Sequence, residues 1–353
     1  MAEVTEIETR KTEHLRINLD ENVRSGLTTG LEHFRLIHRA LPEVDLDAVN
    51  MEQTLFGKKV RAPILVSSMT GGTHQAGQIN HILSEAAQAT GVAIGVGSQR
   101  AALEHPELVN TFQVRHIAPD VLLFANLGAI QLNYGYGLEQ CQRAVEMIQA
   151  DALILHFNAI QEAVQPEGNT RFSGLARKLE QVCRALPVPV IAKEVGWGFS
   201  QDDVRRLAEC GVVAIDTAGA GGTSWSQVEM HRAQTEHQRI QAGEFIGWGI
   251  PTAEAIINVR RGAPGMQIIA SGGLRTGLDI AKCLALGAVL GGMAGPYLKT
   301  AVQSLEKTIQ MIEMVRRTVQ ICMFGTGSES LEAFRHGKIE PIPPRIDLSG
   351  LPV

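Results

Sequence analysis

The stretch ALILHFN, residues 152–158, begins as an uninterrupted apolar run and ends in polar side chains. Apolar runs that do not alternate with polar residues are typical of strands buried on both faces, as in a parallel sheet. Seven further runs of this kind are APILVSSM (62–69), GVAIGVGS (91–98), VLLFANLG (121–128), VPVIAKEVG (188–196), VVAIDTAG (212–219), MQIIASGG (266–273) and AVLGGMAG (288–295). The chain therefore predicts eight strands in a sheet that is covered on both sides.

Segments with helical spacing separate these runs. They are 78–90, 137–150, 174–186, 200–211, 252–262 and 276–287. Ser200, followed three residues later by Asp203, has the spacing of a helix N-cap. Eight strands alternating with helices predict a (β/α)8 TIM barrel over residues 62–297. A doubly wound open sheet would need a G-x-G-x-x-G turn after the first strand, and SSMTGGTHQAG (67–77) does not match it. The short, glycine-flanked run FIGWG (245–249) is interpreted as a loop.

Extensions flank the predicted barrel within a single domain, residues 1–353. Residues 1–61 form an N-terminal extension, which we expect to cover the barrel mouth. Residues 298–353 carry C-terminal helices and a proline-bearing tail. A polar insertion at about 219–250 follows the sixth strand, and we interpret it as a lid, with an ordinary surface loop as the alternative.

Composition limits the class of protein. The 353 residues are 44% hydrophobic and 20% charged, as in a globular enzyme. The net charge of −5 and the absence of a basic run argue against a nucleic-acid partner. No apolar run reaches the ~18 residues that span a membrane, and the acidic start MAEVTEIETRKTEHL is unlike a signal peptide. None of the five cysteines lies in a C-x-x-C pair, which favours reduced thiols and a cytoplasmic location.

Polar residues collect where the predicted strands end. The carboxyl ends of the strands form the active-site face of a TIM barrel. The residues there are Ser67, Ser68, Met69, Thr70, Ser98, Gln99, Arg100, Asn126, His156, Asn158, Gln161, Glu162, Lys193, Glu194, Asp216, Thr217, Thr223 and Ser224. One such residue is more often a helix cap than a ligand contact, but convergence from six strands predicts a polar pocket.

Two glycine-rich turns, SGGLRTG (271–277) and GGMAGP (291–296), follow the seventh and eighth strands. Backbone N–H groups in such turns suit a phosphate, and Arg275 adds a cation, although glycine turns also serve packing. Lys193 lies inside an apolar strand and so needs an anionic partner. It could form a Schiff base or face an electron-rich cofactor ring. The paired turns favour a phosphate-tailed cofactor such as FMN, and a sugar phosphate stays possible.

The motifs together resemble the FMN-dependent type 2 isopentenyl-diphosphate isomerases. The resemblance rests on RKTEHL (10–15), SSMTGG (67–72), GSQR (97–100), HFNAIQE (156–162), AKEVG (192–196), DTAGAGGTSW (216–225) and the two glycine-rich turns. These motifs stand in the family's order and cover residues 10 to about 300. Each motif is weak alone, whereas the set is highly specific.

The resemblance implies a role for each matched position. Contacts to FMN are implied for Ser67, Ser68, Met69, Thr70, Ser98, Asn126, Lys193 and Thr223, and contacts to its phosphate for Gly273, Leu274, Arg275, Ala294 and Gly295. Contacts to a diphosphate substrate are implied for Arg10, Lys11, Ser98, Gln99, Arg100, His156, Asn158 and Gln161. Lys193, Gln161 and His156 would be the catalytic side chains, and Glu162 matches the Mg²⁺ position.

The implied reaction is a 1,3-proton shift between isopentenyl and dimethylallyl diphosphate. The sequence contains no obvious pair of acid and base side chains for it. In the family, reduced FMN is thought to supply them, with N5 the leading candidate, and NADPH or another reductant activates the flavin. Lys193 would stabilise the anionic reduced ring. One carboxylate suffices for Mg²⁺, which takes other ligands from water and substrate phosphate. The family forms homo-oligomers, often tetramers or octamers.

Four other functions have weaker support. A hydroxy-acid oxidase would use His156 as a base, but HFNAIQE does not look like that family. An enzyme like inosine-phosphate dehydrogenase would need a cysteine after the sixth strand, where AGAGGTSW (218–225) has none. A Schiff-base aldolase through Lys193 stays open on the residues alone. A non-catalytic phosphate-binding barrel does not explain the convergence of polar residues at six strand ends.

Overall fold

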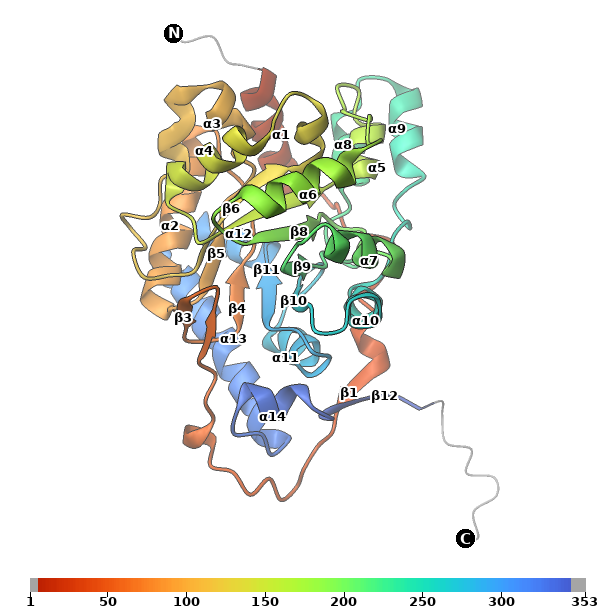
Figure 1. The fold of residues 1–353 in the computed structure, drawn as a ribbon. Coiled ribbons are helices and arrows are strands. Elements are labelled where there is room, and N and C mark those ends of the chain that lie inside the picture. The colour runs from red at the N-terminus through yellow and green to blue at the C-terminus, as the bar shows by residue number, and fades with distance from the viewer. Residues whose placement is uncertain (1–5, 344–353) are drawn as a thin grey trace, which may run out of the picture.

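The computed structural model describes residues 6–343, and eight parallel strands close into a barrel within them (Figure 1). The strands are β4 Ile64–Val66, β5 Ala93–Gly95, β6 Leu123–Gly128, β7 Ala152–Phe157, β8 Val190–Glu194, β9 Ala214–Asp216, β10 Gln267–Ala270 and β11 Leu290–Met293. Their order around the barrel follows the chain, with β11 pairing β4 to close the ring. Each predicted run contains one strand, so the predicted (β/α)8 fold is confirmed, and the run 245–249 is a loop as expected.

The residues inside the barrel change from apolar to polar along the strands. The inner apolar layer contains Leu65, Phe124, Ile154, Ile191, Ala214 and Ile269. Alternate side chains of a strand point to the same face, so the residues two positions further also point inward. These are Ser67, Asn126, His156, Lys193, Asp216 and Ser271, and all of them except the fully buried Asp216 form the floor of the polar pocket. The β2–β3 hairpin (Gln53–Leu55 and Lys58–Val60) packs Leu55 and Val60 against the apolar layer.

Helices surround the barrel and bury the outward-facing strand residues. They are α2 His74–Thr90, α3 Arg100–Glu104, α4 Leu138–Ile148, α6 Leu175–Ala185, α7 Gln201–Glu209, α10 Thr252–Gly262, α11 Gly277–Ala285, α12 Gly295–Ala301 and α13 Leu305–Gly325. The six predicted helices are all present. Helix α2 starts earlier than predicted because Thr73 accepts a hydrogen bond from the backbone of Ala76. Ser200 accepts one from the backbone of Asp203 at 3.1 Å, which confirms that cap.

Further elements lie at the two ends of the barrel (Figure 1). At the carboxyl end are α1 Glu6–Asp20, α5 Ala159–Val164, and α8 Trp225–Arg232 with α9 Glu236–Gly243, the two helices of the polar insertion. At the other end, β1 Phe34–Leu36 pairs antiparallel with β12 Ile339–Pro341, near α14 Leu331–Arg335. Short 3-10 helices are η1 Leu31–His33, η2 Leu46–Ala48, η3 Pro106–Thr111 and η4 Ala129–Asn133.

Helix α1 is placed over the barrel mouth by packing and by one partly buried lysine. Ile17 packs with Val228 of α8, and Lys11 reaches the turns after β4 and β5. The end of the predicted tail, 344–353, lies outside the described residues. Within the described part of the chain, the search for a helix that could cross a membrane finds none.

Candidate active site

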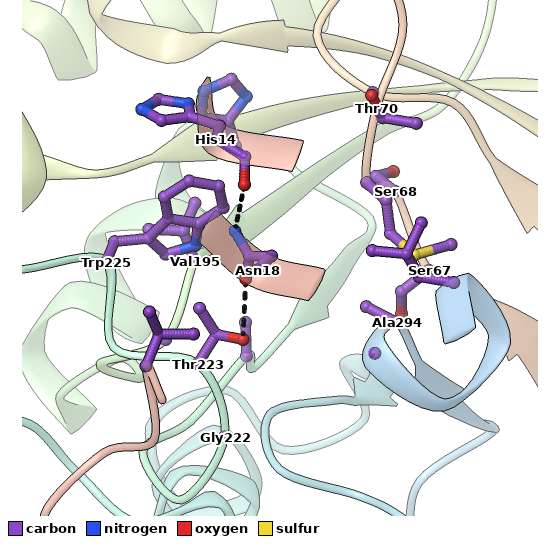
Figure 2. Close-up of a pocket in the computed structure, with 18 of the residues that line it drawn as sticks. His14, Asn18, Ser67, Ser68, Thr70, Val195, Gly222, Thr223, Trp225 and Ala294 are labelled. Carbon is purple, nitrogen blue, oxygen red and sulfur yellow. Dashed lines mark hydrogen bonds between the residues drawn. The ribbon is translucent and has the colours of Figure 1, made fainter. Parts of the chain in front are cut away.

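A cavity of about 950 Å³ opens at the carboxyl end of the barrel, between the strand ends and α1. Figure 2 shows one wall with His14, Asn18, Thr223 and Trp225, and a facing wall with Ser67, Ser68, Thr70 and Ala294. The lining includes every residue to which the family resemblance assigned a ligand contact, with the exception of Gln99. Of the strand-end residues from which the pocket was predicted, Glu194, Asp216, Thr217 and Ser224 also do not line it. The structure therefore brings together positions that lie between residues 10 and 295 of the chain.

Among the residues with an implied ligand contact, Gln99 alone does not line the cavity, so its predicted substrate contact is corrected. Its side chain is fully buried and points toward α4, where Nε2 donates to the carbonyl of Ala144 at 2.8 Å. Its Oε1 accepts from the backbone N–H of Asn126 at 3.0 Å. Gln99 therefore fixes the end of β6, while its neighbours Ser98 and Arg100 line the cavity.

A buried ion pair connects the cavity floor with the residue beneath it: Lys193 lines the cavity, and its partner Asp216 is fully buried. His156, Lys193 and Asp216 stand in register across β7, β8 and β9. Lys193 Nζ lies 3.1 Å from Asp216 Oδ2, and the two residues are 8% and 0% exposed. Ser271 Oγ donates to the other carboxylate oxygen at 2.5 Å. Asp216 is the anionic partner that the position of Lys193 required.

His156 is a neutral imidazole in this site. Its Nδ1 lies 2.8 Å from Asn126 Oδ1, which is an acceptor, so Nδ1 carries the proton. Burial, followed by the positive charges of Lys193 and Lys11, lowers the pKa of His156 to about 4. At neutral pH the other ring nitrogen, Nε2, therefore offers a lone pair and cannot donate a proton.

Two buried hydroxyl groups on the cavity wall make this part of the site fit a polar ligand such as FMN. Ser67 Oγ and Ser68 Oγ have no hydrogen-bond partner among the described residues. Glycine makes room for them, because a Cβ at Gly292 would overlap Ser67 Oγ and one at Gly95 would overlap Ser68 Oγ. Buried polar atoms are nearly always paired in folded proteins, so a bound ligand would complete these hydrogen bonds.

The glycine-rich turn after β10 also fits a phosphate. Gly273 adopts φ +74°, and a Cβ there would come within 2.5 Å of the Gly221 backbone, so the two turns pack against each other without side chains. Such a surface lets backbone N–H groups approach an anion. The N–H of Arg275 instead donates to Asp279 at 3.0 Å as part of the α11 cap, which leaves the exposed Arg275 side chain to face the rim.

Three cations converge at the opposite end of the cavity, near α1. Lys11 Nζ donates to the carbonyls of Gly71 at 2.7 Å and Ser98 at 2.9 Å. Burial, with the charges of Arg10 and Arg100, lowers the pKa of Lys11 to about 7. Burial and Arg100 also lower the pKa of Arg10. Mutual repulsion among these cations is relieved by an anion, so the cluster suits a multiply charged group.

Glu162 lies beside this cationic cluster. Its carboxylate accepts hydrogen bonds from Asn158 Nδ2 at 2.9 Å and from the backbone N–H of Asn169 at 2.5 Å. No group of three metal-ligating His, Cys, Asp or Glu side chains occurs between residues 6 and 343. A single carboxylate fits a Mg²⁺ ion only if water and a bound phosphate provide the remaining ligands.

Glu229 is a site residue that the sequence reasoning missed. It is 3% exposed, and its Oε1 lies 3.0 Å from His14 Nε2 and accepts from Gln161 Nε2 at 2.9 Å. Burial alone would raise the pKa of Glu229, but His14, Gln161 and Arg232 together lower it. His14 and Trp225 belong to motifs already quoted, whereas Glu229 lies in the polar insertion, where no pattern singled it out.

Comparisons with known proteins identify the class. A family model described as FMN-dependent dehydrogenase matches residues 143–341. A mandelate oxidase structure with (S)-4-hydroxymandelic acid has a TM-score of 0.61 at 18% identity, covering 94% of this chain and 95% of that one. At this identity the likeness shows the fold alone. Together with the barrel, the family match places the protein among the FMN-dependent (β/α)8 barrels.

Closer relatives define the family. A protein of a Synechocystis species is 55% identical over 316 residues, covering 89% of this chain and 90% of its own. A Nostoc protein is 50% identical over 330 residues, covering 93% and 94%, and one of Rickettsia peacockii is 47% identical over 330 residues, covering 94% and 96%. All three are named isopentenyl-diphosphate delta-isomerase. The chain belongs to this isomerase family, which confirms the resemblance drawn from the motifs.

Proposed function

We propose that the protein interconverts isopentenyl diphosphate and dimethylallyl diphosphate by a 1,3-proton shift. The observation that carries this proposal is a single cavity with two chemically different ends. One end contains Lys193, two serine hydroxyls without a hydrogen-bond partner among the described residues, and the glycine-rich turns. The other end contains the cationic cluster of Arg10, Lys11 and Arg100 beside Glu162. A flavin would occupy the first end, and a diphosphate the second.

The residues at the first end would bind and tune FMN. Ser67, Ser68 and Thr70 would donate to the ring, and Gly273 with Gly295 would face the phosphate. When bound and reduced, FMN would supply the acid and base for the proton shift, with N5 the leading candidate. The Lys193 ammonium would stabilise negative charge on the reduced ring, because it is fixed at the cavity floor by Asp216.

The residues at the second end would bind the diphosphate. Arg10, Lys11 and Arg100 would neutralise its charge, and Asn158 would add a hydrogen bond. A Mg²⁺ ion on Glu162 would neutralise the remaining negative charge of the diphosphate. These contacts would hold the alkene between the flavin and the wall that contains His14 and Trp225.

Gln161 and His156 would position the reacting alkene. The Gln161 amide donates to Glu229 and accepts from Asn158 Nδ2 at 3.1 Å, so its orientation is fixed. His156 is neutral at pH 7 and would present its Nε2 lone pair to the substrate side of the cavity. Neither group changes protonation easily here, which agrees with a flavin-based proton shift.

Five further proposals concern the reductant, the location, the assembly, the domain organisation and the insertion. NADPH would be the reductant, and because the isomerisation is redox-neutral, it would be needed only to activate the flavin. The protein would be cytoplasmic and would assemble as a homotetramer or octamer. The whole chain, 1–353, would act as one domain. The insertion at about 219–250 would close over the bound ligands.

The test uses the full-length purified protein. We expect a yellow protein with a flavin absorbance spectrum that isomerises isopentenyl diphosphate only when Mg²⁺ and a reductant are both present. Isomerisation without flavin, or a flavin-loaded, reduced protein that leaves isopentenyl diphosphate unchanged, would refute the proposal. Consumption of a 2-hydroxy acid by that inactive protein would instead identify the hydroxy-acid oxidase alternative.

A further inference from the structure

Arg232, at the end of α8, joins three separate segments around the active site. Its Nε lies 2.9 Å from Glu13 of α1, one terminal nitrogen lies 2.9 Å from Glu167 in the turn after α5, and the other lies 2.6 Å from Glu229 of α8. The Arg232 side chain is only 13% exposed. Each of the three guanidinium nitrogens of Arg232 therefore pairs with a different carboxylate.

The contact with Glu229 fixes the direction of a chain of hydrogen bonds that ends in the cavity. Arg232 occupies Oε2 of Glu229, so Oε1 is left to His14 and Gln161. Gln161 then offers its Oε1 to Asn158 Nδ2, which also donates to Glu162. If the Glu229 carboxylate turned, the Gln161 Nε2 group would lose the acceptor of its hydrogen bond, and the amide could rotate.

The contact with Glu13 fixes α1 from its outer side. Glu13 is adjacent to His14, and Arg10 lies one helical turn before His14. Lys11 fastens the same helix from the inner side through Gly71 and Ser98. Arg232 therefore acts on both sets of groups that face the substrate: those on α1 and those that follow β7.

Arginine suits this position for a physical reason. A guanidinium has five N–H donors in a rigid plane and can pair with three carboxylates, whereas an ammonium is a compact point charge. Three carboxylates around one cation would repel each other without it, and Glu229 is too deeply buried to be solvated instead.

We propose that Arg232 is a positioning residue, which holds Glu229, and through it Gln161, in the working orientation and keeps α1 over the cavity. This inference rests on the proposed isomerase function for its kinetic consequences, but not for its structural ones. Arg232 touches neither the flavin end of the cavity nor the reacting carbons. Its loss should change turnover and leave FMN affinity unaltered.

The kinetic experiment compares Arg232→Gln and Arg232→Lys with Arg239→Gln. Arg239 is a matched control, because it is an exposed arginine of the same insertion that pairs with Glu236. Misplacing groups near a reacting centre costs about 100-fold, so we expect kcat of Arg232→Gln to fall by about that factor. Arg232→Lys should recover only part of the loss. FMN affinity should match that of the control.

Two further variants separate the contacts. Glu13→Gln loosens only α1, so we expect a severalfold higher KM for isopentenyl diphosphate with kcat nearly unchanged. Glu167→Gln tests the turn after α5 in the same way. These variants keep Arg232 paired with Glu229, so they test its contacts with α1 and with the turn after α5 even if Arg232→Gln folds poorly. An unchanged KM in Glu13→Gln would overturn the proposed hold on α1.

A structural readout needs no substrate. Hydrogen–deuterium exchange of residues 8–20 in the FMN-loaded protein should be faster in Arg232→Gln than in Arg239→Gln. Equal exchange and equal kcat in these two variants would overturn the inference. If the wild-type protein does not isomerise isopentenyl diphosphate, the proposed function fails, while the exchange comparison still tests the role of Arg232.

Discussion

The buried ion pair between Lys193 and Asp216 gives the sharpest quantitative prediction. Lys193→Met keeps most of the side-chain length but leaves the Asp216 carboxylate, which is 0% exposed, with Ser271 as its hydrogen-bond donor. At the 3.1 Å separation, Coulomb's law with an effective dielectric constant of about 20 gives an attraction of roughly 5 kcal/mol. Removal of one partner of a buried pair typically costs about 3–5 kcal/mol.

The assay is urea unfolding of Lys193→Met, Asp216→Asn and the double variant, each with and without FMN. We expect the free energy of unfolding to fall by about 3–5 kcal/mol in each single variant, because each leaves an uncompensated buried charge. The double variant should recover most of this loss, because no charge stays unpaired. Losses that simply add in the double variant would refute the ion-pair energetics.

Measuring the turnover of the same variants tests the role of Lys193 in catalysis separately from its contribution to stability. The double variant should stay poorly active in its reduced form, because no cation faces the flavin ring. Full activity of the double variant at saturating FMN and reductant would contradict the proposed role of Lys193. This result would leave the stability argument intact, since unfolding is measured without substrate.

Four further outcomes follow from the site. Glu162→Gln should impair Mg²⁺-dependent turnover and leave the FMN dissociation constant unchanged; equal Mg²⁺ titration curves would contradict this. Deletion of residues 1–12 should raise KM while flavin stays bound, and an unchanged KM would sink the idea. Lys11 is cationic below its pKa of about 7 and attracts the diphosphate there, so kcat/KM should fall as pH rises through about 7, and Lys11→Met should lack this limb. Substrate plus Mg²⁺ should protect residues 219–250 from protease, and no protection would count against a lid.

The barrel could be predicted from the sequence because a strand buried on both faces has a continuous apolar run. The runs were longer than the strands, since β4, β5 and β9 have three residues each. The residues that follow these strands leave the sheet and line the cavity. The sequence therefore predicts that each strand exists. It does not predict the residue at which the strand ends, because this depends on where the backbone turns toward the site.

The direction of a side chain in a turn could not be read from residue order. Ser98, Gln99 and Arg100 are consecutive, yet only the first and third face the cavity. Gln99 turns outward because the backbone N–H of Asn126 and the carbonyl of Ala144 need partners there. A match to the GSQR motif implies a ligand contact for all three residues and cannot show which of the side chains face the cavity.

The partner of a buried charge can be predicted from strand register. Lys193 lies inside an apolar strand and needs an anionic partner, and the alternation of a parallel barrel places Asp216 at the same level on the neighbouring strand. The pair could therefore have been inferred from register alone. The position of Glu229 could not be inferred from strand register, because Glu229 lies on a helix. Its position depends on the packing of α8 against α1 through Ile17 and Val228, which are 211 positions apart. Register-related charges are thus predictable from sequence, and charges that are brought together by packing between remote helices require the structure.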